Sequence, residues 1–134
     1  MLDDRTIGKY GPDWPVRKFL AWDENSNRIG WSAYLGEDKA GKDDADVSIY
    51  AAPGRARVDL AGLPRTYIDT PGLDLLRDEK LRYAQALLQA DVEVEFHLYP
   101  GVPHGFDSFD TLRVVAGAHD NRTRAIKSVC RDQG

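Results

Sequence analysis

The sequence predicts an α/β fold with parallel strands, and three patterns lead to this prediction. The apolar run Thr66-Tyr67-Ile68 predicts a first strand that begins within residues 65–70, and residues 92–99 alternate apolar and polar side chains as a half-buried strand does. Between them, residues 78–89 repeat apolar side chains at helical spacing. A helix that joins two strands in this way allows them to pair in parallel.

The composition is that of an ordinary globular domain. The 134 residues are 42% hydrophobic and 30% charged, with a net charge of −4, so we expect no basic surface for nucleic acid. The single cysteine, Cys130, excludes an internal disulfide and a cysteine metal cluster. No apolar run is long enough to span a membrane, and the N-terminus lacks the basic and apolar regions of a signal peptide. We therefore expect a cytoplasmic protein without a membrane span.

The segment before the first strand predicts loops around one short helix. Residues 1–25 mix turn formers with large aromatic side chains, which indicates a surface connection with buried anchors. An N-cap at Asn25-Ser26-Asn27 and the glycine Gly36 bound a short amphipathic pattern. Residues 37–46 are typical of a solvated loop, and their acids lack the spacing of a calcium site. Residues 47–53 are apolar and are expected to pack under the edge of the sheet.

Ser32 lies in a partial nucleophile motif. Gly30-Trp31-Ser32-Ala33-Tyr34 lacks the second glycine of a Gly-x-Ser-x-Gly elbow, and no strand runs into it. The strained strand-to-helix turn of an elbow needs small residues on both sides of the serine. We therefore interpret Ser32 as a helix residue and not as a nucleophile.

Several polar residues in the predicted elements have structural interpretations. Asp78 and Glu79 head the helix between the strands, where the helix dipole favours acids. His97 falls on the polar face of the second strand and is expected to be solvated. A closing amphipathic helix is predicted over residues 118–130, with Cys130 as a small buried side chain.

Asp74 and His104 each follow a predicted strand on a short turn. They are 30 positions apart, which is about the length that one crossover helix and one further strand need. Both turns are then expected at the edge where the strands end, the usual place for ligands and catalytic groups in α/β sheets. There the carboxylate of Asp74 would accept a hydrogen bond from the imidazole of His104. On spacing alone, an equal alternative is that both residues only shape their turns.

Four motifs resemble the hormone-sensitive-lipase-like esterases, the α/β-hydrolase fold-3 group. The motifs are Trp31-Ser32-Ala33-Tyr34-Leu35-Gly36, Asp59-Leu60-Ala61-Gly62-Leu63-Pro64, Leu73-Asp74-Leu75-Leu76-Arg77-Asp78-Glu79 and Tyr99-Pro100-Gly101-Val102-Pro103-His104-Gly105-Phe106. The resemblance implies that residues 1–134 are the C-terminal half of an α/β-hydrolase domain, with its last parallel strands and flanking helices and with the upstream strands missing. It also implies that Asp74 is the acid and His104 the base of a catalytic triad.

Two departures from that family qualify the resemblance. Thr70-Pro71-Gly72 stands where the family has a small and an acidic residue, so a differently shaped turn is expected before Asp74. The chain also holds no Gly-x-Ser-x-Gly elbow and no His-Gly-Gly-Gly-like stretch. We expect the adjoining upstream sequence to encode both, as the missing N-terminal half of the same domain.

The functional expectation follows from the resemblance and its gaps. It implies hydrolysis of small-molecule carboxylic esters without a metal or other cofactor, and an isolated chain that is inactive because it lacks the nucleophile. One alternative is a non-catalytic α/β-hydrolase-like fragment or pseudoenzyme that binds an apolar ligand or another chain. Another is a helper chain that completes an active site in trans.

Overall fold

A computed structural model describes residues 1–56, 60–109 and 111–131. The chain divides into two compact units, residues 1–104 and residues 105–134. Asp59, the first residue of one family motif, lies outside the described residues. Within the described ranges, no helix has both the length and the apolar content that crossing a bilayer requires.

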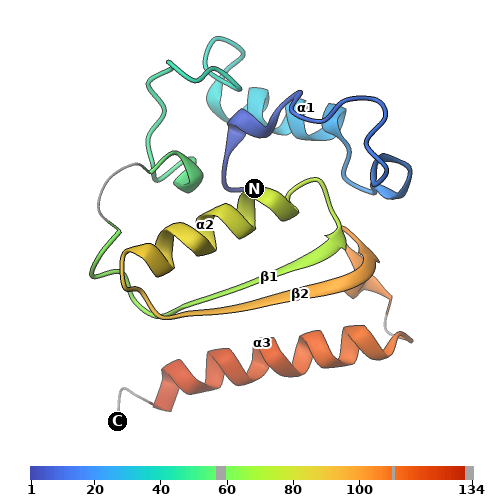
Figure 1. Cartoon of the computed structure of the whole chain (residues 1–134), viewed down its shortest axis with the longest axis vertical. Helices are drawn as coiled ribbons and strands as arrows, with labels where there is room; N and C mark the ends of the chain where they lie inside the picture. Colours follow the sequence, from blue (N-terminus) through green and yellow to red (C-terminus); the bar gives the residue numbers. More distant parts are fainter. Residues whose placement is uncertain (57–59, 110, 132–134) are drawn as a thin grey trace. The chain divides into compact units, whose positions relative to one another are not determined.

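The first unit contains a parallel two-stranded sheet. Strand β1 (Thr66–Leu73) pairs with β2 (Val94–Pro103), and helix α2 (Arg77–Gln89) connects them (Figure 1). The predicted strand–helix–strand order and the parallel pairing are therefore confirmed. Both strands are longer than expected: β1 continues to Leu73 and β2 continues to Pro103.

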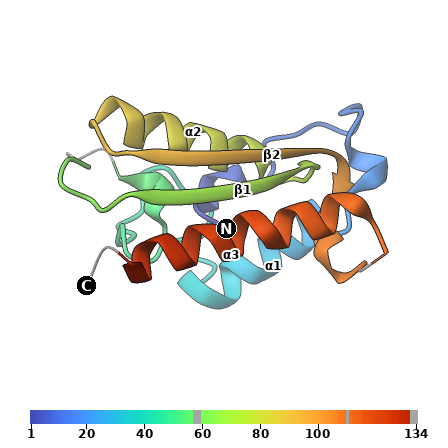
Figure 2. The ribbon, with the colours of Figure 1, turned by 90° about the horizontal axis from the view of Figure 1, so that it is seen from below.

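Helix α2 contacts both strands and covers one face of the sheet in this unit (Figures 1 and 2). Ala84 and Leu87 are buried there, as their helical spacing predicts. Leu81 and Leu88, which are seven positions apart and share one side of the helix, are exposed. The predicted amphipathic helix is therefore confirmed, with its buried stripe beside the side that carries Leu81 and Leu88.

Helix α1 (Glu24–Leu35) lies beyond α2 from the sheet and toward the β1 side (Figures 1 and 2). The predicted helix is confirmed, but its N-cap is Asp23 and not a residue of Asn25-Ser26-Asn27. The Asp23 side chain accepts a hydrogen bond from the Ser26 N–H at 2.8 Å and so begins the helix earlier. Gly36 follows the last turn with φ of 93°, a conformation that a side chain would strain.

The remaining N-terminal segments are irregular apart from three single 3₁₀ turns. These are η1 (Asp4–Thr6), η2 (Arg17–Phe19) and η3 (Pro53–Arg55). Tyr50 is 92% exposed, so the expected packing of residues 47–53 under the sheet edge is wrong. That segment is anchored by the small buried side chain of Ala52 instead.

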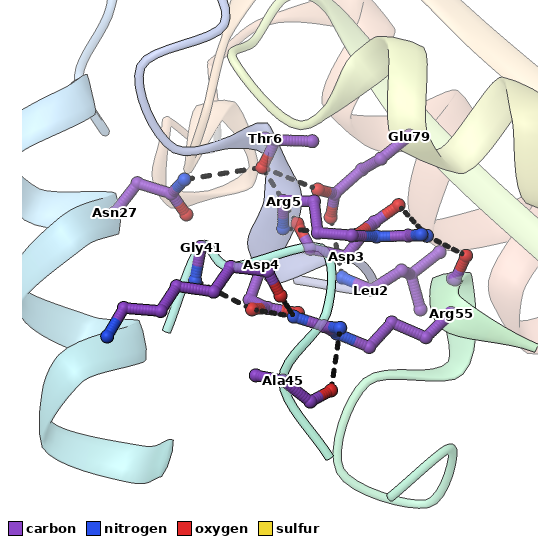
Figure 3. Close-up of polar contacts among 12 residues, drawn as sticks. Leu2, Asp3, Asp4, Arg5, Thr6, Asn27, Gly41, Ala45, Arg55 and Glu79 are labelled. Atoms are coloured by element: carbon purple, nitrogen blue, oxygen red, sulfur yellow. Dashed lines mark hydrogen bonds and ion pairs between the residues drawn. The ribbon is translucent and has the colours of Figure 1, made fainter. Parts of the chain in front are cut away.

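A buried ion pair organises the irregular region. Arg55 donates from Nε to Asp4 Oδ1 at 2.6 Å and from Nη2 to Asp4 Oδ2 at 2.7 Å, and the Gly41 N–H donates to Oδ2 at 2.8 Å (Figure 3). Arg55 also donates to the carbonyl oxygens of Lys42 and Ala45. Burial raises the pKa of Asp4, but Arg55 and Gly41 outweigh it and hold that pKa below its ordinary value.

Glu79 fixes the N-terminal segment to α2. Its carboxylate accepts hydrogen bonds from the Leu2 N–H and, at 3.1 Å, from the Thr6 hydroxyl, to which the Asn27 amide donates in turn (Figure 3). Glu79 is only 2% exposed, and its burial raises the pKa of its carboxyl. It does head the helix as predicted, but its interpretation as a mere dipole partner is incomplete.

The second unit contains η4 (Phe106–Ser108) and helix α3 (Arg113–Arg131). The predicted closing helix is confirmed and begins five residues earlier than expected. Within the unit, Arg122 Nη1 donates to Asp107 Oδ2 at 2.7 Å. Cys130 is an exposed free cysteine, so the prediction that it is buried is wrong.

The Asp4–Arg55 pair yields a stability prediction. Asp4→Asn replaces one accepting oxygen by an amide donor facing Arg55 and leaves the buried guanidinium without its counter-charge. We expect a loss of about 3 kcal/mol or more in the free energy of unfolding. Urea denaturation followed by tryptophan fluorescence measures it. Arg17→Met, which breaks the exposed Arg17–Glu24 bridge, is the matched control and should cost under about 1 kcal/mol; equal losses would contradict the prediction.

Candidate active site

The turns that follow β1 and β2 meet at one edge of the sheet. Asp74 comes directly after β1 and His104 directly after β2. The His104 Nδ1 atom lies 3.1 Å from Asp74 Oδ2, which is within hydrogen-bond distance. The structure thus brings together the two residues that the sequence analysis singled out.

A glycine allows the two strand ends to approach this closely. A Cβ atom on Gly72 would lie 3.2 Å from the Tyr99 carbonyl oxygen and 3.3 Å from the Pro100 Cα, both fixed backbone atoms. The pairing register shifts between Pro71 and Leu73, next to this contact. The segment expected to form an altered turn therefore continues β1 and delivers Asp74 to the edge where β2 ends.

Asp74 is fully buried, accepts two hydrogen bonds and forms an ion pair. The Leu76 N–H donates to Oδ1 at 3.0 Å, while His104 Nδ1 and, at 3.5 Å, Lys80 Nζ face Oδ2. Burial alone raises the pKa of the Asp74 carboxyl, but the hydrogen bonds from His104 and Leu76 and the charge of Lys80 outweigh it. The net pKa lies below its ordinary value, so Asp74 is a carboxylate near neutral pH.

The ionised state of Asp74 determines the proton position on His104. A carboxylate only accepts hydrogen bonds, so the shared proton belongs on Nδ1 and the unprotonated nitrogen of a neutral ring is Nε2. The His104 side chain is 39% exposed, and Nε2 makes no hydrogen bond to any residue that the structure describes. An oriented imidazole with a free basic nitrogen is suited to general base catalysis.

Trp22 packs beside this imidazole. The two ring centroids are 5.9 Å apart with their planes tilted by 34°. The indole lies against Gly30 of α1, where a Cβ atom would be 3.4 Å from Trp22 Cζ2, an ordinary van der Waals contact. The sequence analysis expected buried aromatic anchors in this segment but had no signal that placed Trp22 next to His104.

The N-terminal segment also holds the first turn of α2, just after Asp74. The Tyr10 hydroxyl donates to Asp78 Oδ2 at 2.9 Å, and burial with this bond raises the pKa of Tyr10 to about 12. The Tyr10 and Trp14 rings stack at 4.1 Å, and the Arg77 guanidinium lies 5.9 Å from the Trp14 ring. Arg77 donates to Asp78 at 2.7 Å and to the Gly72 carbonyl at 3.0 Å. Asp78 is thus more than a dipole partner, since it joins α2 to the N-terminal segment.

The other polar candidates lie elsewhere. Ser32 is within α1, as expected, and among the described residues it makes no contact with His104. His97 is half-buried, with Nε2 2.7 Å from Glu95 Oε1 and its ring between those of Tyr67 and Tyr99, so the expectation of a merely solvated side chain is wrong. The described residues contain no cluster of three or more His, Cys, Asp or Glu side chains arranged to hold a metal ion.

Comparison with known proteins identifies the family. The model of the family described as alpha/beta hydrolase fold matches residues 5–108. The chain belongs to this family. The carboxylesterase NlhH of Mycobacterium tuberculosis is 45% identical over 80 residues, which cover 60% of this chain and 24% of NlhH. The structure of a bacterial heroin esterase matches with a TM-score of 0.81 and 42% identity, over 96% of this chain and 39% of that one.

A more distant structure extends the comparison. Brefeldin A esterase, described as a bacterial homologue of human hormone sensitive lipase, shares the fold at 22% identity, with a TM-score of 0.71 over 97% of this chain and 37% of that one. The resemblance to hormone-sensitive-lipase-like esterases is confirmed, as is a partial α/β-hydrolase fold. The chain spans about a quarter of the length of two curated relatives, NlhH and the esterase LipI of Mycobacterium tuberculosis.

The lowered pKa of Asp74 predicts a pH dependence of stability. The carboxylate stabilises the folded chain above the ordinary carboxyl pKa, and this stabilisation is lost as the pH falls through the lower folded-state pKa. We expect the free energy of unfolding to fall below about pH 5 and Asp74→Asn to make that fall shallower. Urea denaturation at a series of pH values measures both curves. Asp13→Asn, at an exposed acid, is the control, and a slope for Asp74→Asn that matched this control would refute the prediction.

Proposed function

We propose that this chain supplies the acid and the base of a serine carboxylesterase, with Asp74 as the acid and His104 as the base. The observation that carries the proposal is the 3.1 Å contact between the fully buried Asp74 carboxylate and His104 Nδ1. The family membership supports it, because the curated relatives with the strongest matches are named esterases or carboxylesterases.

The geometry suits each step of ester hydrolysis. His104 Nε2 takes the proton of a serine hydroxyl as the serine oxygen attacks the ester carbonyl, and the imidazolium then gives that proton to the departing alcohol. A water molecule is activated in the same way to release the acid. Throughout, Asp74 holds the imidazole in the Nδ1–H tautomer and stabilises the imidazolium, without itself taking up the proton.

The serine and the oxyanion-binding groups are proposed to come from another part of the domain. This agrees with the sequence, which has no elbow motif, and with the greater length of the relatives, since this chain spans 39% of the heroin esterase structure. Loss of a triad nucleophile costs about as much activity as loss of the whole triad. The isolated chain is therefore proposed to be inert toward esters, and its substrates are small carboxylic esters only within a completed domain.

A chimera tests the proposal. The part of NlhH that precedes its matched region is joined to this chain, and hydrolysis of p-nitrophenyl butyrate is followed. We expect turnover by the chimera and none above background by the isolated chain. His104→Ala should lower kcat by several orders of magnitude, and Asp74→Asn by about 10⁴-fold because it favours the wrong imidazole tautomer.

The matched control is Asp78→Asn, which removes a nearby acid that lies in the first turn of α2 and does not belong to the pair. It loses hydrogen bonds to Tyr10 and Arg77, each worth about 1 kcal/mol of stability, and should keep activity within about tenfold. A folded, active chimera that is indifferent to His104→Ala would overturn the proposal. A folded chimera with no turnover would favour a non-catalytic binding fragment, with circular dichroism showing that it is folded.

A further inference from the structure

We propose that Lys80 is a positioning residue of the acid–base pair, which shares the Oδ2 atom of Asp74 with His104 and keeps that carboxylate ionised and fixed. The inference rests on the proposed function, because it gives the pair a third member. The evidence for it is that two nitrogen atoms face the buried Oδ2 atom of Asp74, His104 Nδ1 at 3.1 Å and Lys80 Nζ at 3.5 Å.

The placement of Lys80 needs an explanation. It is the fourth residue of α2, in the first turn, where the helix dipole disfavours a positive charge. Side chains of a helix lean toward its N-terminus, and this lean directs the ammonium group back to Asp74, six positions earlier. The Lys80 side chain is only 18% exposed, and no second carboxylate among the described residues pairs with it. The Asp74 charge is thus what favours a cation at this position.

The charges of Lys80 and Arg77 and the imidazole of His104 all act on Asp74, and among the described residues Lys80 is the permanent cation whose nitrogen faces Oδ2. His104 comes from the turn after β2 and is charged only when protonated, whereas Lys80 is a cation from the first turn of α2. Arg77, the other cation of this helix turn, donates hydrogen bonds to Asp78 and to the Gly72 carbonyl oxygen. On the N-terminal side, Trp22 next to His104 is uncharged, and Tyr10 is bound to Asp78.

Two consequences follow for the pair. While His104 is neutral, Lys80 still supplies an ion pair to the buried carboxylate. The Leu76 N–H holds Oδ1, and the Lys80 charge beside Oδ2 opposes rotation of the carboxyl group away from the imidazole. Lys80 therefore preserves the acceptor that keeps His104 in its Nδ1–H tautomer, and it acts through Asp74 without touching substrate.

The test uses the isolated chain and needs no nucleophile. The carboxyl ¹³C signal of Asp74 is titrated with acid in the wild type, in Lys80→Met and in Lys80→Gln. Since the charge of Lys80 helps to lower the pKa of Asp74, both variants should move the titration midpoint to higher pH. Lys80→Arg keeps the charge and should restore the wild-type midpoint. Ring ¹⁵N shifts of His104 should show a larger share of the Nε2–H tautomer in the two uncharged variants.

The control is Lys39→Met, which removes the same charge from an exposed loop. Its midpoint should stay at the wild-type pH, so that a shift in the Lys80 variants reports a local contact. Equal midpoints for Lys80→Met and Lys39→Met, or failure of Lys80→Arg to restore the midpoint, would overturn the role of Lys80. An inactive chimera would overturn the esterase proposal and leave this titration as it is, so the two failures are distinguishable.

Discussion

All contacts of the candidate site depend on the parallel pairing of β1 with β2. Parallel strands end at the same edge of a sheet, so two turns far apart in sequence become neighbours there. In this chain the approach is closer than pairing alone requires, because Gly72 has no side chain to hold the Tyr99 carbonyl away. A side chain at position 72 would meet backbone atoms of β2, so this glycine helps to keep Asp74 close to His104.

A second constraint acts from the other side of α2. Arg77, Asp78 and Glu79 are consecutive, and each contacts the N-terminal segment through Trp14, Tyr10, or Leu2 and Thr6. Since α2 begins three residues after Asp74, these contacts fix the helix end against which the acid turn is folded. The carboxylate is held by the sheet edge on one side and by this anchored helix turn on the other, which is the preorganisation that triad chemistry needs.

The elements of this unit could be predicted because their signals are local. Alternation over 92–99 and helical spacing over 78–89 depend on neighbouring residues, and the meeting of Asp74 with His104 follows from the order of those elements. The contacts of the N-terminal segment could not be predicted, since they join residues far apart in the sequence. Asp4 and Arg55 are 51 positions apart, and Leu2 and Glu79 are 77 positions apart. Glu79 shows what the sequence cannot predict. A carboxylate in the first turn of a helix has the same sequence pattern whether it faces water or a buried backbone amide.

The polar contacts of Leu2, Asp4 and Thr6 join residues that are far apart in the sequence. This has a consequence for how this region can be exchanged between related genes. A recombination joint placed between residues 6 and 41 would take Asp4 from one parent and Gly41 and Arg55 from another, and would separate Thr6 from Glu79. Each mismatch there leaves a buried charge or a buried donor unpaired. A joint outside residues 2–79 keeps all of these partners from one parent, so hybrids that exchange this segment as a whole should remain folded.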